Sequence, residues 1–180
     1  MKATKGVILL GSSNSKGETF QLVRYVAEHT GYRIIDLKEK HILPFDYEFN
    51  NRHDDFLPLI KEIVSNYELI IFATPVYWYT MSGTMKIFFD RISDCLKTEK
   101  ETGRKLRGMK MAVLSCGSDE ILKDGFHMPF IESANYLSMH YMGHVHGWIE
   151  NDSIPAEVKK TWMVLFKKLP EWNSAGISKE

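Results

Sequence analysis

An excess of charge of either sign is missing from this chain. Its 180 residues include 23 Lys and Arg against 23 Asp and Glu, so the net charge is zero with neutral His. A balanced chain has no general attraction for a polyanion, which argues against nucleic acid as a partner. Long apolar runs are also missing, since none approaches the roughly 20 residues that a membrane-spanning helix needs. We therefore expect a protein that binds neither nucleic acid nor a membrane.

Cysteine is scarce as well. Cys95 and Cys116 are the only two, and their spacing fits no metal-binding or redox motif. The apolar run 7–10 ends at Gly11, which is too soon for the apolar core of a secretion signal. Unused thiols without such a signal are typical of a cytoplasmic protein. At this length we expect one domain over residues 1–180.

The chain does contain a regular alternation of apolar strands and amphipathic helices. Continuous apolar runs at 7–10 and 69–73 are typical of parallel strands covered on both faces. Strands are predicted at 5–11, 33–37, 68–74, 110–116 and 141–149, and helices at 18–30, 54–66, 82–96, 125–139 and 155–169. This alternation predicts an α/β fold, a three-layer doubly wound sandwich around a five-stranded parallel sheet of order 2-1-3-4-5. The charged stretch 97–109 is expected to be a solvated connection, and the tail from Glu171 is expected to fray.

Three loops follow the carboxyl ends of strands, where doubly wound sheets bind their ligands. The first, 11–19, offers hydroxyl and amide groups at the start of a helix, an arrangement that suits a phosphate. It is not a P-loop, because Glu18 follows Lys16 and Gly17 where that motif needs G-K-[ST], and it lacks the three glycines of a dinucleotide fingerprint. It therefore suits a terminal monophosphate, although an ordinary strand–turn–helix connection would also account for it.

The second and third loops suit a flat ring. Loop 74–83 carries Tyr77, Trp78 and Tyr79 in succession at an edge that should be exposed to solvent. A planar ligand, a dimer contact or a covered apolar patch would account for these three aromatic residues. Loop 115–119 contains small residues that let a ring approach the backbone, although a plain β-to-α turn would also account for them. A monophosphate pocket beside an aromatic wall favours FMN as the ligand.

Two segments resemble a known family. G-S-S-N-S-K-G-E-T at 11–19 is similar to the G-S-x-R-x-x-G-N-T phosphate loop of the NAD(P)H-dependent FMN reductases and NAD(P)H:quinone oxidoreductases. A-T-P-V-Y-W-Y-T-M-S-G-T-M-K-I-F-F-D-R at 73–91 resembles the P-x-Y-x-x-x-x-x-G-x-x-K-x-x-x-D-R segment of that group. The resemblance implies a flavodoxin-like fold, bound FMN, NAD(P)H as the electron donor and a homodimer.

The resemblance also assigns residues to the cofactor. It implies that the phosphate is bound by Ser12, Asn14, Gly17, Glu18 and Thr19, and the isoalloxazine ring by Pro75, Val76, Tyr77, Trp78, Ser115, Gly117 and Ser118. Two positions depart from the pattern: Asn14 stands where many members have Arg, and Glu18 stands where Asn is common. Glu18 adds negative charge beside a dianionic phosphate, and Lys16 could compensate for it.

These observations favour an FMN-dependent oxidoreductase that transfers a hydride from NAD(P)H through FMN to a quinone, a flavin or a similar acceptor. The cofactor supplies the chemistry, so we assign no catalytic side chain. A flavodoxin-type electron carrier is the alternative, although such carriers are usually acidic and this chain is not. A flavin-free binding protein on the same scaffold is a third possibility.

Several other residues invite interpretation. His144 and His146 share a face of a predicted strand and, with His140, resemble a metal site, but no fourth ligand is evident and we expect no metal. His127 is expected at a helix start in solvent, with contact to a bound ring as the alternative. Lys86 and Asp90 are expected to pair along one helix. Tyr47 and Phe49, in loop 41–53, could cover a flavin or contact a second subunit.

Overall fold

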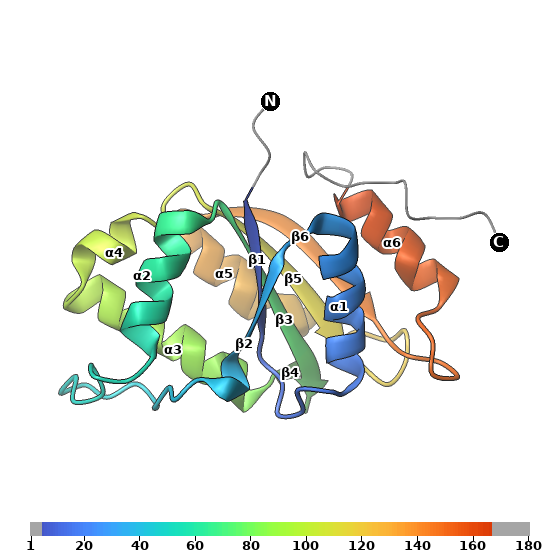
Figure 1. The fold of residues 1–180 in the computed structure, drawn as a ribbon, viewed down its shortest axis with the longest axis horizontal. Coiled ribbons are helices and arrows are strands. Elements are labelled where there is room, and N and C mark those ends of the chain that lie inside the picture. Colours follow the sequence, from blue (N-terminus) through green and yellow to red (C-terminus); the bar gives the residue numbers. More distant parts are fainter. Residues whose placement is uncertain (1–4, 167–180) are drawn as a thin grey trace.

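Five parallel strands form the centre of the structure, a computed structural model that describes residues 5–166. The strands lie in the order β2-β1-β3-β5-β6 (Figure 1). Their bounds are β1 Gly6–Leu10, β2 Arg33–Asp36, β3 Leu69–Tyr77, β5 Lys110–Cys116 and β6 His140–Gly147. A two-residue strand, β4 (Thr80–Met81), pairs antiparallel with the end of β3. The predicted order of the parallel strands is confirmed, and β4 is an addition within the predicted second loop.

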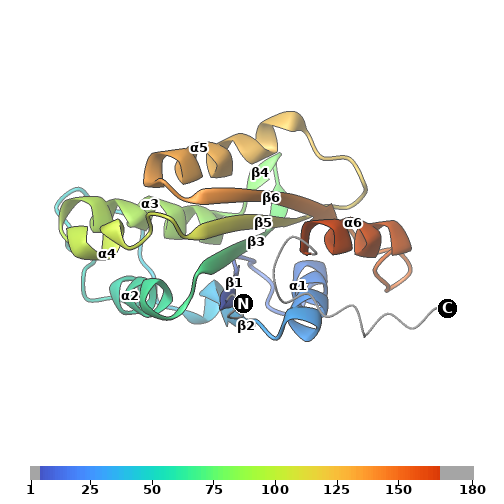
Figure 2. The same ribbon diagram turned by 90° about the horizontal axis from the view of Figure 1, so that it is seen from above.

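Helices cover both faces of this sheet, as Figure 2 shows. One face carries α1 (Glu18–Thr30) and α6 (Ala156–Phe166), and the other carries α2 (Phe56–Asn66), α3 (Gly83–Lys97) and α5 (Met128–Leu137). Within β1, Ile8 and Leu10 belong to the apolar core under α1 and α6, whereas Val7 and Leu9 belong to the core on the other face. A strand buried on both faces must be apolar at every position, which explains the continuous run in the sequence.

The stretch 97–109 corrects one prediction. It contains a short helix, α4 (Lys100–Arg104), in which Thr102 and Gly103 are buried. A Cβ at Gly103 would lie 2.4 Å from the carbonyl oxygen of Cys95, so only glycine permits this close approach between α4 and α3. The stretch is thus packed against the core, while its charged side chains remain exposed, as at Glu101, Arg104 and Arg107.

Boundaries differ more modestly elsewhere. The predicted helix 125–139 is a 3-10 turn, η2 (Asp124–His127), followed by α5. A second 3-10 turn, η1 (Leu37–Glu39), follows β2. The end of the predicted helix 155–169 and the tail from Glu171 lie outside the described residues. Within residues 5–166, no helix is long and apolar enough to cross a membrane.

Candidate functional site

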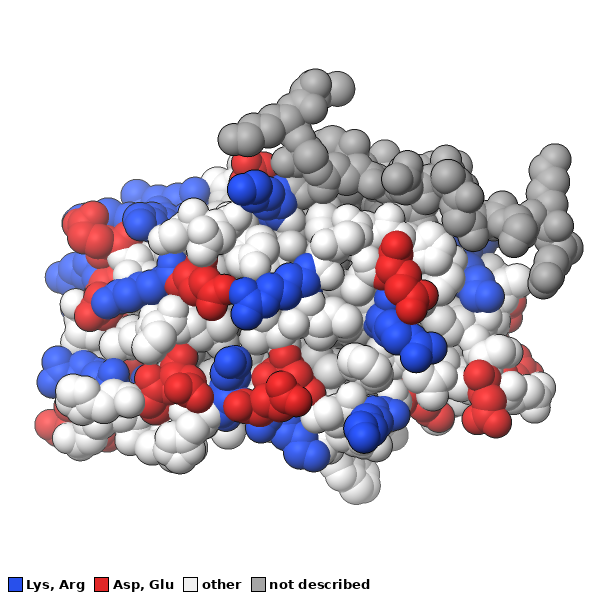
Figure 3. Space-filling view, viewed as in Figure 1, with Lys and Arg blue, Asp and Glu red and all other residues white. Residues whose placement is uncertain are grey.

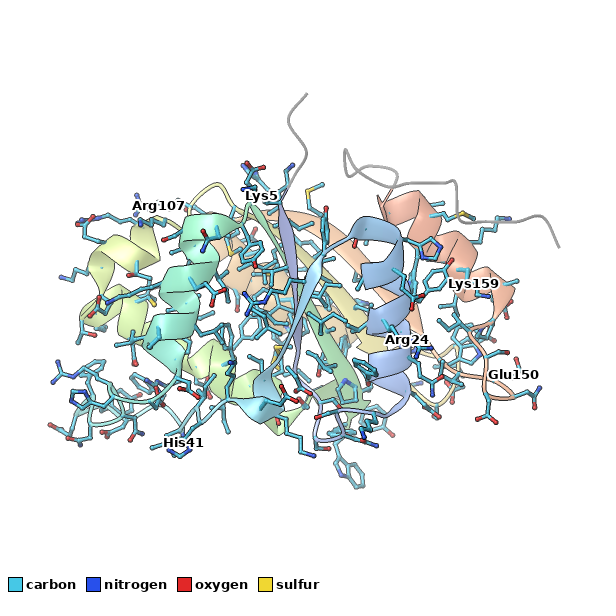
Figure 4. All side chains as sticks on the ribbon, viewed as in Figure 1. Lys5, Arg24, His41, Arg107, Glu150 and Lys159 are labelled. Atoms are coloured by element: carbon cyan, nitrogen blue, oxygen red, sulfur yellow. The ribbon has the colours of Figure 1, made fainter. Side chains whose placement is uncertain are left out.

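The carboxyl ends of the parallel strands meet at the lower edge of the sheet in Figure 1, and the three predicted loops leave from it. Figure 4 labels His41 near this edge, and Lys5 and Arg107 near the opposite one. The winding of the chain alone therefore brings residues 11–17, 77–80 and 117–123 to one side of the molecule.

The first loop begins in a tightly packed position. The backbone N–H of Gly11 donates to the carbonyl oxygen of Ala73 at 2.8 Å, and the hydroxyl of Ser82, the N-cap of α3, donates to the carbonyl oxygen of Gly11. A Cβ at Gly11 would lie 2.7 Å from the Met85 side chain. Glycine is thus required where the loop passes between β3 and the start of α3.

Bonds within the loop then shape its path to α1. Ser12 Oγ accepts from the N–H of Asn14 at 3.1 Å, and Asn14 Oδ1 accepts from the N–H of Lys16 at 3.1 Å. Gly17 is the N-cap of the 13-residue helix α1 and supplies no side-chain cap. The first N–H groups of α1 therefore point into the loop without a capping side chain, which suits an anion. Glu18 is exposed in the first turn.

The second loop is a hairpin rather than an irregular loop. β3 continues through the buried Pro75 to Tyr77, so the strand ends three residues later than predicted. Trp78 and Tyr79 form the turn with φ of 49° and 65°. In two-residue hairpin turns, positive φ values of this kind are usually adopted by Asn-Gly. Two exposed aromatic residues in this strained geometry are typical of a functional site. Tyr77 Oη lies 2.9 Å from Ser13 Oγ, which joins this hairpin to the first loop.

The hairpin and the third loop enclose one cavity of about 460 Å³. Its lining residues are Val76, Trp78, Tyr79, Gly117, Ser118, Asp119, Ile121, Leu122 and Lys123. Four of the predicted residues are thus brought together here. The other lining residues, from Tyr79 to Lys123, were not predicted as site residues, although the apolar pair Ile121 and Leu122 within a polar loop could have indicated a binding surface.

Other predicted residues are close to the edge but do not line this cavity. Pro75 is buried within β3, and Ser12 and Thr19 are only 3% and 4% exposed. Ser115 is fully buried, and its hydroxyl is hydrogen-bonded to His146. Asn14, Gly17 and Glu18 remain accessible in the first loop.

Three histidines gather behind the third loop. The rings of His127 and His144 stack with centroids 3.3 Å apart, so the expectation of His127 in open solvent is wrong. Burial, together with the neighbouring His144 and His146, lowers the pKa of His127 to about 4. Burial and His146 likewise lower the pKa of His144. Over residues 5–166 no group of three or more His, Cys, Asp or Glu side chains is arranged to hold a metal ion.

Both cysteines are free and buried, and burial raises the pKa of each thiol to about 12. At neutral pH they are protonated and unreactive.

Acidic and basic side chains are intermixed on the face that Figure 3 shows, without a broad patch of one sign.

Comparison with known proteins identifies the family. A family model described as NADPH-dependent FMN reductase matches residues 4–153. The chain belongs to this NADPH-dependent FMN reductase family. Membership confirms the resemblance, the enzyme class and FMN as the cofactor of that class.

Individual relatives agree with this family. The chain is 30% identical to YwqN of Bacillus subtilis (strain 168), which carries the name of an NAD(P)H-dependent FMN-containing oxidoreductase, over 77% of this chain and 79% of that protein. The fold of this FMN reductase family member is also similar to two solved structures. The Trp repressor binding protein from Bacillus subtilis has a TM-score of 0.68 at 22% identity, covering 95% of this chain and 99% of the other. An FMN-dependent NADH-azoreductase from Bacillus anthracis, in complex with FMN, has a TM-score of 0.67 at 14% identity, covering 92% and 99%.

Proposed function

We propose that this FMN reductase family member holds FMN across the three loops and transfers a hydride from NAD(P)H, through FMN, to a quinone, a free flavin or a similar small acceptor. The observation that carries the proposal is the cavity of about 460 Å³ in the hairpin and third loop, together with the Tyr77–Ser13 hydrogen bond that joins this hairpin to the loop before α1, whose first N–H groups have no capping side chain. A phosphate and a planar ring need these two features side by side.

Each loop has a separate task in this proposal. The first loop binds the phosphate through the N–H groups around Asn14, Gly17 and Glu18, while the buried Ser12 and Thr19 support its shape. Val76, Tyr77 and Trp78 border one side of the ring, and the small residues Gly117 and Ser118 let its other edge approach the backbone. Ser115 and Pro75 support these positions from within the sheet.

FMN, when bound, supplies the redox chemistry by accepting a hydride at N5 and passing electrons to the acceptor. Segment 117–119 would offer backbone N–H donors to the edge of the ring that becomes negative on reduction, and the hairpin 77–80 would help to orient the ring. Hydride transfer requires no acid–base side chain, so no residue is assigned to proton transfer. We expect the protein in the cytoplasm, where NAD(P)H is available as the electron donor.

Absorption spectroscopy tests the proposal directly. The purified chain mixed with FMN should retain a flavin spectrum after gel filtration, and NADPH or NADH should bleach it until a quinone is added. Ser118→Trp fills the cavity and should abolish retention, whereas Ser65→Trp, at an exposed position on α2, should not. Retention without NAD(P)H oxidation would instead support the electron-carrier alternative, and no retention by the wild-type chain would refute the proposal.

A homodimer is the second part of the proposal. A groove of about 530 Å³ lies between α3 and α5, and its lining combines polar residues with apolar ones such as Phe89, Leu96 and Tyr136, which is 77% exposed. A groove with exposed aromatic surface suits a second copy of the chain. Light scattering should give twice the chain mass, and Tyr136→Glu should shift it toward the monomer. A monomeric wild-type chain at every concentration would refute dimerisation.

A further inference from the structure

His146 on β6 joins the sheet to the third loop through both nitrogens of its ring. Nδ1 lies 2.8 Å from Ser115 Oγ, and Nε2 lies 2.9 Å from the backbone carbonyl oxygen of Asp119. A carbonyl oxygen can only accept, so Nε2 carries the proton. In the neutral ring Nδ1 then accepts from the Ser115 hydroxyl. The two bonds together select a single tautomer.

The surroundings of the ring keep it neutral. Burial lowers the pKa of His146, and the nearby Asp119 only partly opposes this effect. The titratable and charged groups around the ring are His144 on the same strand, His127 in η2 and Asp119 in the third loop. At neutral pH the imidazole therefore has the protonation that its two hydrogen bonds require.

The ring also shapes the loop by packing. A Cβ at Gly117 would lie 2.9 Å from Cε1 of His146, so this glycine allows the backbone to lie directly on the imidazole. The N–H of Gly117 donates to the carbonyl oxygen of Gly147 at 3.0 Å. Asp119 Oδ1 in turn accepts from the N–H of Ile121 at 2.8 Å. Contacts with His146 and Gly147 on β6 therefore fix the conformation of segment 117–121.

We propose that His146 is a positioning residue for the flavin site: its Nε2–H bond to Asp119 holds segment 117–119 in the conformation that borders the isoalloxazine ring. The inference rests on the proposed function. His146 is not among the residues that line the cavity, so it acts through the loop and not by contact with the ring. A loop that is already ordered loses less conformational entropy when the ligand binds, which increases affinity.

Two substitutions separate the two nitrogens. In His146→Gln, Nε2 of glutamine can occupy the place of the imidazole Nε2 and still donate to Asp119. In His146→Asn, Oδ1 of asparagine can replace Nδ1 opposite Ser115, but no donor reaches Asp119. FMN titration of the full-length chain, followed by quenching of flavin fluorescence, should show about a 5- to 10-fold loss of affinity for the Asn variant and less than about a 2-fold loss for the Gln variant.

The outcomes distinguish this inference from the function on which it rests. Equal affinity of the Asn variant and the wild type, or an equal loss in both variants, would overturn the role of the Nε2 bond while leaving FMN binding intact. If the wild-type chain does not bind FMN, the proposed function is refuted as well. Independently of any flavin, ¹⁵N NMR of the ligand-free chain should show the Nε2–H tautomer of His146, and the opposite tautomer would also overturn the inference. Unfolding midpoints of the two variants check that both are folded.

Discussion

The guanidinium of Arg91 lies against the carboxylate of Asp54, and the two side chains are only 1% and 2% exposed. Nη2 of Arg91 is 3.2 Å from Asp54 Oδ1 and 2.8 Å from Asp94 Oδ2, and it also donates to the carbonyl oxygen of Asn51 at 3.0 Å. Burial alone would raise the pKa of Asp54, but the hydrogen bonds from Arg91 hold it below its ordinary value. Helix α3 thereby fastens the loop between η1 and α2 to the rest of the molecule.

Removing one charge of this pair should be costly. Asp54→Asn leaves the Arg91 guanidinium buried with less compensation, so the free energy of unfolding should fall by about 3 kcal/mol in urea titrations. Asp90→Asn is the matched control, because Asp90 pairs with Lys86 on the same helix with side chains 45% and 58% exposed. That exposed pair contributes less than about 0.5 kcal/mol. Similar losses in the two variants would contradict the structural role of the buried pair.

Helical spacing predicted the pairing of Lys86 with Asp90 correctly, because partners four residues apart must meet on a helix. The same spacing could not reveal that Arg91 reaches Asp54, which lies 37 residues away in the loop between η1 and α2. The order of the strands was predictable for a similar reason, since apolar runs and crossover handedness restrict the choices. The hydrogen bonds of His146 and the burial of Gly103 could not be predicted from the sequence, because both depend on how distant segments pack together.

We predict that the hairpin turn at Trp78 and Tyr79 lowers the stability of the fold and contributes to FMN binding. The double substitution W78N/Y79G puts residue types that tolerate positive φ at both strained positions, so the free energy of unfolding should rise by about 1–2 kcal/mol. Loss of the aromatic wall should weaken FMN binding about 3- to 10-fold. The single variant Tyr79→Gly, which keeps Trp78, should gain part of the stability and retain most of the affinity. A double variant less stable than the wild type would refute strain at this turn.

The stacked pair of His127 and His144 should make the fold sensitive to mild acid. The pKa of His127 is about 4 in the folded chain, against about 6.5 when unfolded, so the unfolded state takes up a proton first as the pH falls. The stabilisation is complete above pH 6.5 and is lost as the pH falls toward 4. Because the imidazole is only half-buried, we expect a loss of about 1–2 kcal/mol.

Urea unfolding at pH 7.5, 5.5 and 4.5 measures this effect. His127→Gln should reduce the dependence of stability on pH, whereas His53→Gln, at an exposed position in the loop before α2, should leave it unchanged. A wild-type chain whose stability does not change between pH 7 and 5 would show that His127 is not held in its neutral form.

The departure at Glu18 should lower the affinity for the phosphate of FMN. Glu18 is exposed in the first turn of α1, at the same N–H groups that would bind the phosphate dianion. Glu18→Gln removes a like charge, so FMN affinity should rise about 2- to 5-fold at low salt, and the gain should shrink in 0.5 M NaCl. Glu28→Gln, at the other end of the same helix and paired with Arg24, should change nothing. Riboflavin, which has no phosphate, should bind the Glu18 variant and the wild type equally, and an equal gain for both ligands would place the phosphate away from the start of α1.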